Sequence, residues 1–209
     1  MTVNEWFDKW NGKKIEWDNV SYYQCVDALK CYIQEVYKIK TKGKGTSAWG
    51  NAISYFDSFN NNKWGGYYPF HKAGFQRFKN TRLFIPMLGD IGIFRSGLYG
   101  HVCICTGEGN ISRFKSYDQN WGGQYLHEVV HDYTDFVGVL RPPRWVQADV
   151  NVRDSPDIKG KKIGELSAGT KVMPLCYSGN WIKISDDAYI HANYLYPTGT
   201  PPKWGKYDL

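Results

Sequence analysis

The spacing of apolar residues predicts two helices near the start of the chain. Residues 3–11 place apolar side chains at helical spacing and end at Asn11-Gly12, which predicts a short amphipathic helix. Residues 25–38 keep the i, i+3, i+4, i+7 pattern of a longer helix. The positions that form this second pattern are Cys25, Ala28, Leu29, Tyr32, Ile33, Val36 and Tyr37. A further short helix is predicted over 48–58, inside a stretch rich in Gly and Asn.

From Pro86 onward the pattern changes to short strands separated by turn residues. Strands are predicted at 91–94, 100–106, 111–118, 124–130 and 136–140. Pro142 and Pro143 end this series, because proline has no N–H to donate to a strand ladder. More short strands, separated by Gly, Asp and Asn turns, are then predicted at 150–153, 161–166, 171–177, 180–184 and 188–191. This second set is typical of a small β-barrel.

The two prolines therefore divide the chain into two domains. We predict a domain of α+β class over 1–141, a linker over 142–146 and a small all-β domain over 147–196. The tail over 197–209 carries three prolines and is predicted to be irregular.

Composition and charge narrow the class of protein. Of the 209 residues, 17% are aromatic and 22% are charged, which is typical of a globular protein whose surfaces are lined by aromatic side chains. No apolar run approaches the roughly 18 residues needed to cross a membrane, and the N-terminus lacks the basic and apolar regions of a secretory signal. The net charge of +6 favours an anionic partner such as a cell-wall polymer. Nucleic acid has the same sign of charge, but we find no basic cluster or nucleic-acid motif.

The cysteines raise the question of a reactive thiol. Their number is odd and they form no CxxC pair, so we expect no disulfide framework and at least one free thiol. They are Cys25, Cys31, Cys103, Cys105 and Cys176. Cys25 stands at the first position of the longer predicted helix, where free N–H groups and the helix dipole stabilise a thiolate. A buried helical cysteine is the simpler interpretation, but the polar Gln24 just before it favours the reactive one.

A thiolate hydrolase also needs a base and a group that orients the base. His101 opens a predicted strand, and Asp118 and Asn120 lie on or just after the returning strand of the same hairpin. Positions 118 and 120 share a face at strand spacing, so a carboxylate or an amide would lie beside the imidazole. The order Cys, His, Asp/Asn is that of papain-like enzymes.

Two further sets of residues have alternative interpretations. His101, Cys103 and Cys105 share one strand face and include only zinc-binding residue types, so a zinc site is one alternative. Their separation of about 6.5 Å per pair is awkward for one tetrahedral ion, which favours packing behind the base. Trp64 and Trp121 would either line a substrate groove or pack in a core.

Four short motifs resemble the CHAP family, the cysteine- and histidine-dependent amidohydrolases/peptidases. They are Gln24-Cys25-Val26-Asp27, Gly89-Asp90-Ile91-Gly92, Gly100-His101-Val102 and Asp118-Gln119-Asn120-Trp121. Each motif alone is weak, but all four follow in the family's order over about residues 12–141. The resemblance implies a papain-like α+β fold with Cys25 as nucleophile and His101 as base. It further implies that Asp118 orients His101, that Asn120 is a fourth member, and that Gln24 and the Cys25 N–H hold the oxyanion.

The segment before the nucleophile carries the spacing of a calcium loop. The candidate ligands occupy positions 1, 3, 5, 7 and 12 of a twelve-residue window, and they are Glu16, Asp18, Val20, Tyr22 and Asp27. Glu at position 1 and Val at position 5 depart from the usual loop, and taken alone the spacing is most simply chance. Some CHAP domains of phage lysins look similar here and bind calcium, so the resemblance favours Ca²⁺ as a cofactor.

The second domain resembles the bacterial SH3-like family over about residues 147–196. The resemblance rests on five segments: Asn151–Pro156, Ile163–Leu166, Gly169–Val172, Asn180–Ile184 and Tyr189–Leu195. It implies binding to the bacterial cell wall.

Together these features predict a peptidoglycan hydrolase of the endolysin type that cleaves an amide or peptide bond of the wall. A non-catalytic wall-binding protein with a degenerate first domain is the alternative. We expect peptidoglycan and wall polymers as partners, no nucleic acid, no membrane, and a monomer. The absence of a signal peptide favours a protein made in the host cytoplasm that reaches the wall after release at lysis.

Overall fold

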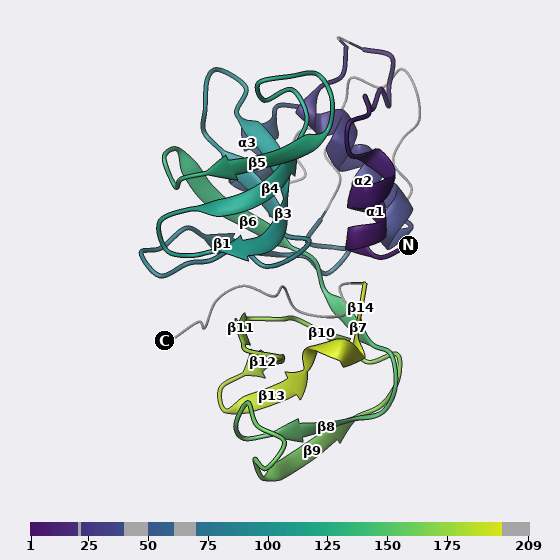
Figure 1. Ribbon diagram of the computed structural model, residues 1–209, viewed down its shortest axis with the longest axis vertical. Coiled ribbons are helices and arrows are strands. Elements are labelled where there is room, and N and C mark those ends of the chain that lie inside the picture. Colours follow the sequence, from purple (N-terminus) through teal and green to yellow (C-terminus); the bar gives the residue numbers. More distant parts are fainter. Residues whose placement is uncertain (21, 40–49, 61–69, 198–209) are drawn as a thin grey trace.

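The computed structural model describes residues 1–20, 22–39, 50–60 and 70–197, and its first domain is built around a six-stranded sheet (Figure 1). The chain begins with helices α1 (Val3–Trp10), α2 (Cys25–Tyr37) and α3 (Ala52–Asp57). The sheet strands are β1 (Gln76–Lys79), β2 (Ile91–Phe94), β3 (His101–Gly109), β4 (Phe114–Asp118), β5 (His127–His131) and β6 (Phe136–Arg141). The strand order is β1-β6-β2-β3-β4-β5, and every neighbouring pair is antiparallel.

At the start of both predicted N-terminal helices, nearby side chains accept hydrogen bonds from backbone N–H groups that have no partner within the helix. In α1 the Thr2 hydroxyl accepts from the Glu5 amide at 3.2 Å, and the Glu5 carboxylate accepts from the Thr2 amide at 2.7 Å. In α2 the Asp27 carboxylate reaches back to accept from the Gln24 amide at 2.8 Å. These interactions fix each helix start, and in α2 they place Cys25 in the first turn.

Strand β3 is buried on both faces of the sheet. Val102 and Ile104 face the helices and join the main core, which also contains Trp6, Tyr32 and Ile33. On the opposite face, a second core consists of Phe94, Cys103, Cys105, Phe114, Phe136 and Val139. The sheet therefore lies between two apolar layers. The second of these layers surrounds one end of the predicted catalytic hairpin.

The second domain contains two small antiparallel sheets. One has the order β10-β7-β14, from β7 (Arg144–Val146), β10 (Lys171–Val172) and β14 (Leu195–Tyr196). The other has the order β11-β12-β13-β8-β9, from β8 (Val150–Arg153), β9 (Lys162–Leu166), β11 (Cys176–Ser178), β12 (Trp181–Ser185) and β13 (Ala188–His191). A 3-10 turn, η1 (Ala192–Tyr194), precedes β14. The predicted fold class, α+β with a small all-β module, is confirmed.

Several element boundaries differ from the sequence-based expectation. Residues 144–146, expected in a linker, form β7 and pair with β10 and β14. The strand expected over 171–177 is split into β10 and β11, because Pro174 has no N–H for a ladder. The strand expected from 111 begins at Phe114, since Asn110 accepts from the amides of Ser112 and Arg113 in a turn. Most of the predicted irregular tail lies outside the described residues.

Arg141 connects the two domains. Arg141, at the end of β6, donates two hydrogen bonds to Asp90 through Nε at 2.9 and 3.1 Å and a third through Nη2 at 2.7 Å. Its Nη1 donates to the carbonyl of Leu175 in the second domain at 2.5 Å. Arg141 is 1% exposed and Asp90 is fully buried. Met87, from the loop before β2, packs in the core of the second domain. The domains are therefore held by buried polar and apolar contacts, which explains the role of Asp90 within its motif.

Within the described residues, every helix is too short or too polar to cross a membrane.

Candidate active site

Cys25 lines an open cavity at the start of helix α2. The cavity has a volume of about 620 Å³. Among its lining residues are Gln24, Cys25, Ser96, Tyr99, His101, Asn120 and Trp121. Cys25 is partly exposed, so its sulfur is accessible from this cavity. The site thus combines a thiol at a helix N-terminus with space for a substrate.

The other four cysteines lie in less reactive surroundings. All five carry free thiols, and all lie in the described part of the chain. Burial raises the pKa of Cys31 to about 12, and it also raises the pKa values of Cys103, Cys105 and Cys176. A raised pKa keeps a thiol protonated and a poor nucleophile. Cys25 is therefore the cysteine that the structure leaves available for chemistry.

His101, the first residue of β3, forms a buried hydrogen bond with Asp118, the last residue of β4. Its Nε2 lies 2.7 Å from Asp118 Oδ2, and the Asp118 side chain is fully buried. Because an ionised carboxylate only accepts hydrogen bonds, Nε2 carries the proton. The other ring nitrogen, Nδ1, is then the one available to Cys25, with which His101 also forms a hydrogen bond.

Charged neighbours control the protonation of both groups. Burial alone lowers the pKa of His101, but its hydrogen bonds to Asp118 and Cys25 outweigh burial and raise it to about 10. Burial raises the pKa of Asp118, but hydrogen bonds from His101 and His131 outweigh burial and hold it below its ordinary value. Asp118 is thus an anion that stabilises an imidazolium, which is the arrangement that a Cys–His hydrolase needs.

The strand register explains why these distant residues meet. Cys105 is paired with Ser116 across β3 and β4, so extending the pairing brings Cys103 opposite Asp118 and His101 to the same end of the hairpin. Residues two apart on a strand share a face, so His101 and Asp118 project on the same side of the sheet. The hairpin predicted from sequence is therefore present, and Asp118 provides the group beside the imidazole.

Asn120 and Gln24 lie on the wall of the same cavity. Asn120 is exposed and has a positive φ of 62°, which Asn tolerates better than most residues. Gln24 precedes Cys25 as the N-cap residue of α2. The structure thus brings Gln24, Cys25, His101, Asp118 and Asn120 into one region.

Sequence reasoning missed Gln119, which connects the two halves of the site. Its side chain is fully buried. The amide Nε2 donates to the carbonyls of Ile15 at 2.8 Å and Gln24 at 2.9 Å, and Oε1 accepts from the Ile15 amide at 2.7 Å. The sequence offered no signal for this role, because the burial of Gln119 and its partners, about a hundred residues away, become visible only in the folded structure.

Aromatic side chains pack around the imidazole of His101. Trp121 lies 4.8 Å from His101 between ring centroids, and Phe94 lies 6.2 Å away. Trp121 therefore both packs against the base and lines the cavity, so the two roles considered for it are compatible. Trp64 lies outside the described residues.

The zinc alternative does not match the observed geometry. Two groups of three potential ligands occur among the described residues, and neither is the set His101, Cys103 and Cys105. Cys103 and Cys105 instead pack in the apolar layer behind the base. Cys103 does lie near Asp118 and His131, with ligand atoms within 4.8 Å, but burial holds its thiol protonated and Asp118 is already hydrogen-bonded. In this structure Asp118 and His131 are joined by a hydrogen bond of 3.0 Å.

The predicted calcium loop does bring its three carboxylates together. Ligand atoms of Glu16, Asp18 and Asp27 lie within 4.8 Å of one another. Lys30 forms an ion pair with Asp18 and lies 3.9 Å from Asp27 Oδ1. Three carboxylates and one ammonium leave an excess of negative charge.

The excess of negative charge is most evident at Asp27. Its Oδ1 is buried without a hydrogen-bond partner among the described residues. Burial raises the Asp27 pKa to about 6, and the charge of Asp18 contributes in the same direction. Carboxylate oxygens in this state suit a hard cation, so the residues fit calcium. For Val20 and Tyr22 only the backbone carbonyls would take part, and Tyr22 has a positive φ of 52°.

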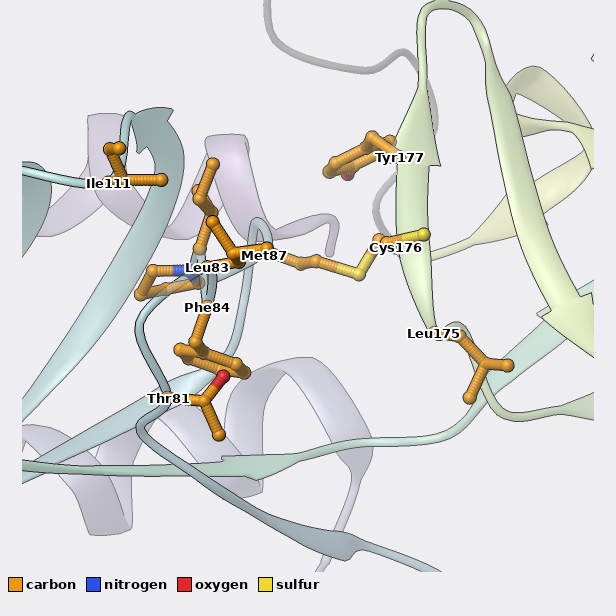
Figure 2. Close-up of a pocket in the computed structure, with 10 residues that line it drawn as sticks. Thr81, Leu83, Phe84, Met87, Ile111, Leu175, Cys176 and Tyr177 are labelled. Carbon is orange, nitrogen blue, oxygen red and sulfur yellow. The ribbon is translucent and has the colours of Figure 1, made fainter. Parts of the chain in front are cut away.

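A second cavity lies away from this chemistry, between the two domains. It has a volume of about 310 Å³ and is largely apolar. Figure 2 shows Leu83, Phe84 and Met87 on the side of the first domain and Leu175, Cys176 and Tyr177 on the side of the second. The charged groups that act on Cys176 are the cations Lys183 and Arg141, and the lining residues of this cavity include no histidine or carboxylate that could act as a base.

Comparison with known proteins identifies the class of the second domain. Residues 148–196 match the family model described as the bacterial SH3 domain, which confirms the resemblance predicted for this module. This part of the chain is therefore similar to the bacterial SH3 domain.

A solved structure shows a similar fold over most of the chain. The crystal structure of the wild-type endolysin LysIME-EF1 has a TM-score of 0.51 and 23% identity, covering 86% of this chain and 77% of that chain. The crystal structure of Ly7917 has a TM-score of 0.45 and 16% identity, covering 98% of this chain and 97% of that chain. The chain thus shares the fold of the endolysin LysIME-EF1.

Proposed function

We propose that the protein is a peptidoglycan hydrolase of the endolysin type that uses Cys25 as a nucleophile. The observation that carries the proposal is that Cys25 and His101 interact at the wall of one open cavity and that the His101 ring is hydrogen-bonded to the buried Asp118 carboxylate. A fold shared with an endolysin and a bacterial SH3 domain in the same chain support peptidoglycan as the substrate.

The proposed reaction proceeds through an acyl-enzyme. Cys25 transfers its proton to His101 Nδ1, and the thiolate attacks the carbonyl carbon of a wall amide. The imidazolium returns a proton to the departing amine as the C–N bond breaks, leaving a thioester on Cys25. His101 then takes a proton from water, and the hydroxide attacks the thioester. The products are an amine, a carboxylic acid and free Cys25.

Each step uses a feature of the described site. Asp118 holds the proton on His101 Nε2 and stabilises the imidazolium that forms twice in the cycle. In this proposal the Cys25 backbone N–H, at the start of α2, and the side chain of Gln24 would stabilise the oxyanion. Asn120 and Trp121 line the cavity where the substrate would bind.

The loop before α2 supports a structural role for calcium. Glu16, Asp18 and Asp27 would hold the ion, with Val20 and Tyr22 contributing carbonyl oxygens. Bound there, calcium would supply positive charge that fixes the backbone before Cys25. Asp27 provides the connection, because its other oxygen accepts from the Gln24 amide.

A lysis assay on purified cell walls tests the proposal. Cys25→Ala should lose at least 1,000-fold in rate, an order of magnitude typical for a removed nucleophile. Cys176→Ala is the matched control, because it removes a partly buried thiol far from His101, and it should retain lysis. Mass spectrometry of the released fragments should show new amine and carboxyl termini. Lysis by the Cys25→Ala protein at the wild-type rate would disprove the thiol mechanism.

The alternative function is wall binding without catalysis. In that case the wild-type protein would sediment with walls through its SH3 domain but release no new termini. The ordered Cys25–His101–Asp118 arrangement supports the enzyme, because a non-catalytic domain needs no buried anion behind a histidine.

A further inference from the structure

A second histidine contacts the same carboxylate as the proposed base. His131, the last residue of β5, is 5% exposed, and its Nε2 lies 3.0 Å from Asp118 Oδ2. His101 Nε2 lies 2.7 Å from the same oxygen. The mechanism above uses no atom of His131, yet the structure buries its ring beside the centre.

The hydrogen-bond chemistry fixes the direction of this contact. Asp118 has its pKa held below the ordinary value, so it is an anion that can only accept. His131 must therefore donate through a protonated Nε2. Ser116 Oγ donates to the other oxygen, Oδ1, at 2.5 Å. Asp118 thus accepts three hydrogen bonds, from β3, from β5 and from its own strand.

Packing holds the His131 ring in this orientation. Ring centroids lie 4.7 Å from Phe94, 5.6 Å from Phe114 and 5.0 Å from Trp121. Phe94 and Trp121 also pack against His101. The two imidazoles therefore share one aromatic enclosure, and neither can rotate freely away from Asp118.

We propose that His131 is a positioning residue of the catalytic centre, which donates a hydrogen bond to Asp118 and so holds the carboxylate ionised and aligned on His101. This inference rests on the proposed hydrolase function. Without the donor, burial would raise the pKa of Asp118, and the carboxylate would have a second orientation open to it. Other titratable groups near Asp118 are His101, Cys103 and Cys105 on β3, where burial keeps both thiols neutral. On β5, His127 pairs with Asp118 across the ladder, but its ring hydrogen-bonds to the Tyr125 carbonyl.

Two substitutions separate the donor from the ring. His131→Gln keeps an N–H donor at similar reach, whereas His131→Phe keeps the ring among Phe94, Phe114 and Trp121 but cannot donate. We expect the Phe variant to lose about 10- to 100-fold in kcat, the range for a lost hydrogen bond to a charged group, with little change in KM. The Gln variant should recover most of this loss. His127→Phe is the matched control on the same strand, because His127 contacts the Tyr125 carbonyl instead.

The pH profile distinguishes positioning from simple packing. In the Phe variant Asp118 should be protonated at higher pH, so the acidic limb of kcat/KM should move upward by about one pH unit. In the Gln variant and in His127→Phe it should remain at the wild-type pH. A Phe variant with wild-type kcat and an unmoved limb would overturn the inference, as would a folded Gln variant as impaired as the Phe variant.

A measurement on the unaltered protein covers the case in which the Phe variant does not fold. Imidazole ¹⁵N NMR should show Nε2 of both His101 and His131 protonated at neutral pH. An unprotonated His131 Nε2 would overturn the inference directly. If the wild-type protein releases no new termini from walls, the proposed function fails, and the NMR result still decides whether His131 donates to Asp118.

Discussion

The Gln119 side chain donates a hydrogen bond of 2.9 Å to the backbone carbonyl of Gln24, the residue before Cys25. Gln119 itself follows Asp118 in the chain, so this contact joins the strand that carries the acid to the helix that carries the thiol. Ile15 completes the connection by exchanging two hydrogen bonds with the same side chain. The distance between Cys25 and His101 therefore depends on Gln119.

Replacing Gln119 should loosen this connection. Gln119→Leu would leave the Ile15 amide and the carbonyls of Ile15 and Gln24 without their buried partner. We expect a loss of about 2–4 kcal/mol in the free energy of unfolding and at least a tenfold drop in kcat, with a smaller change in KM. Gln124→Leu is the control, because that side chain is exposed. Unchanged kcat in a folded Gln119→Leu protein would contradict this role.

Replacing Asp118 should change stability in a pH-dependent way. The folded-state pKa of His101 is about 10 against an ordinary value of 6.5, so its ionic contribution is complete below about pH 6.5 and is lost as the pH rises through 10. The Asp118 pKa is lowered from 3.8, so its contribution is lost as the pH falls below that value. Asp118→Asn should therefore lower the melting temperature most near pH 5–6, and the difference should shrink toward pH 10.

The pH dependence of activity at high pH should also depend on the charges of His101 and Asp118. Because Asp118 raises the pKa of His101, the alkaline limb of the wild-type profile should lie near pH 10 and that of Asp118→Asn at lower pH. A melting difference that is constant from pH 5 to pH 10 would show that the pair does not carry charge. Asn120→Ala serves as the comparison, since Asn120 lies on the cavity wall and should alter KM rather than these limbs.

The buried Arg141–Asp90 ion pair at the domain boundary should contribute strongly to stability. Arg141→Met would leave Asp90 buried and unpaired and would remove the contact to Leu175, so we expect a loss of about 3–5 kcal/mol. Arg95→Met is a matched control, because Arg95 also binds an aspartate, Asp57, through two hydrogen bonds but on the surface. It should change the melting temperature little. Equal effects of the two substitutions on chemical denaturation would refute the prediction.

Calcium should stabilise the loop before α2. An ion at a hundredfold excess over its dissociation constant would add about 2.7 kcal/mol to the free energy of unfolding. EDTA should lower both the melting temperature and lysis, and added calcium should restore them. Asp18→Asn should remove the calcium-dependent rise, whereas Asp8→Asn, at an exposed carboxylate elsewhere, should keep it. A melting curve that EDTA and calcium leave unchanged would show that the loop binds no calcium.

Local patterns in the sequence were enough to predict much of this molecule. The apolar spacing of residues 25–38 determined helix α2 and so placed Cys25 at a helix start, because helical periodicity depends on neighbours three and four apart. Alternation along β3 likewise put His101, Cys103 and Cys105 on one face. The second domain was predicted from short segments that fit a known family, and the family model matches it.

What the tertiary structure decided depends on contacts between distant segments. The β3–β4 register sets Asp118 opposite Cys103, two residues from His101, so only the tertiary structure shows that the carboxylate of Asp118 is the partner of the imidazole. Only the position of β5 adds His131 to the same oxygen. In the sequence Gln119 is an ordinary turn residue, because the three backbone groups that it contacts belong to segments far away in the chain. Sequence periodicity reports which face a residue occupies, whereas the identity of its partner depends on how the whole sheet packs and pairs.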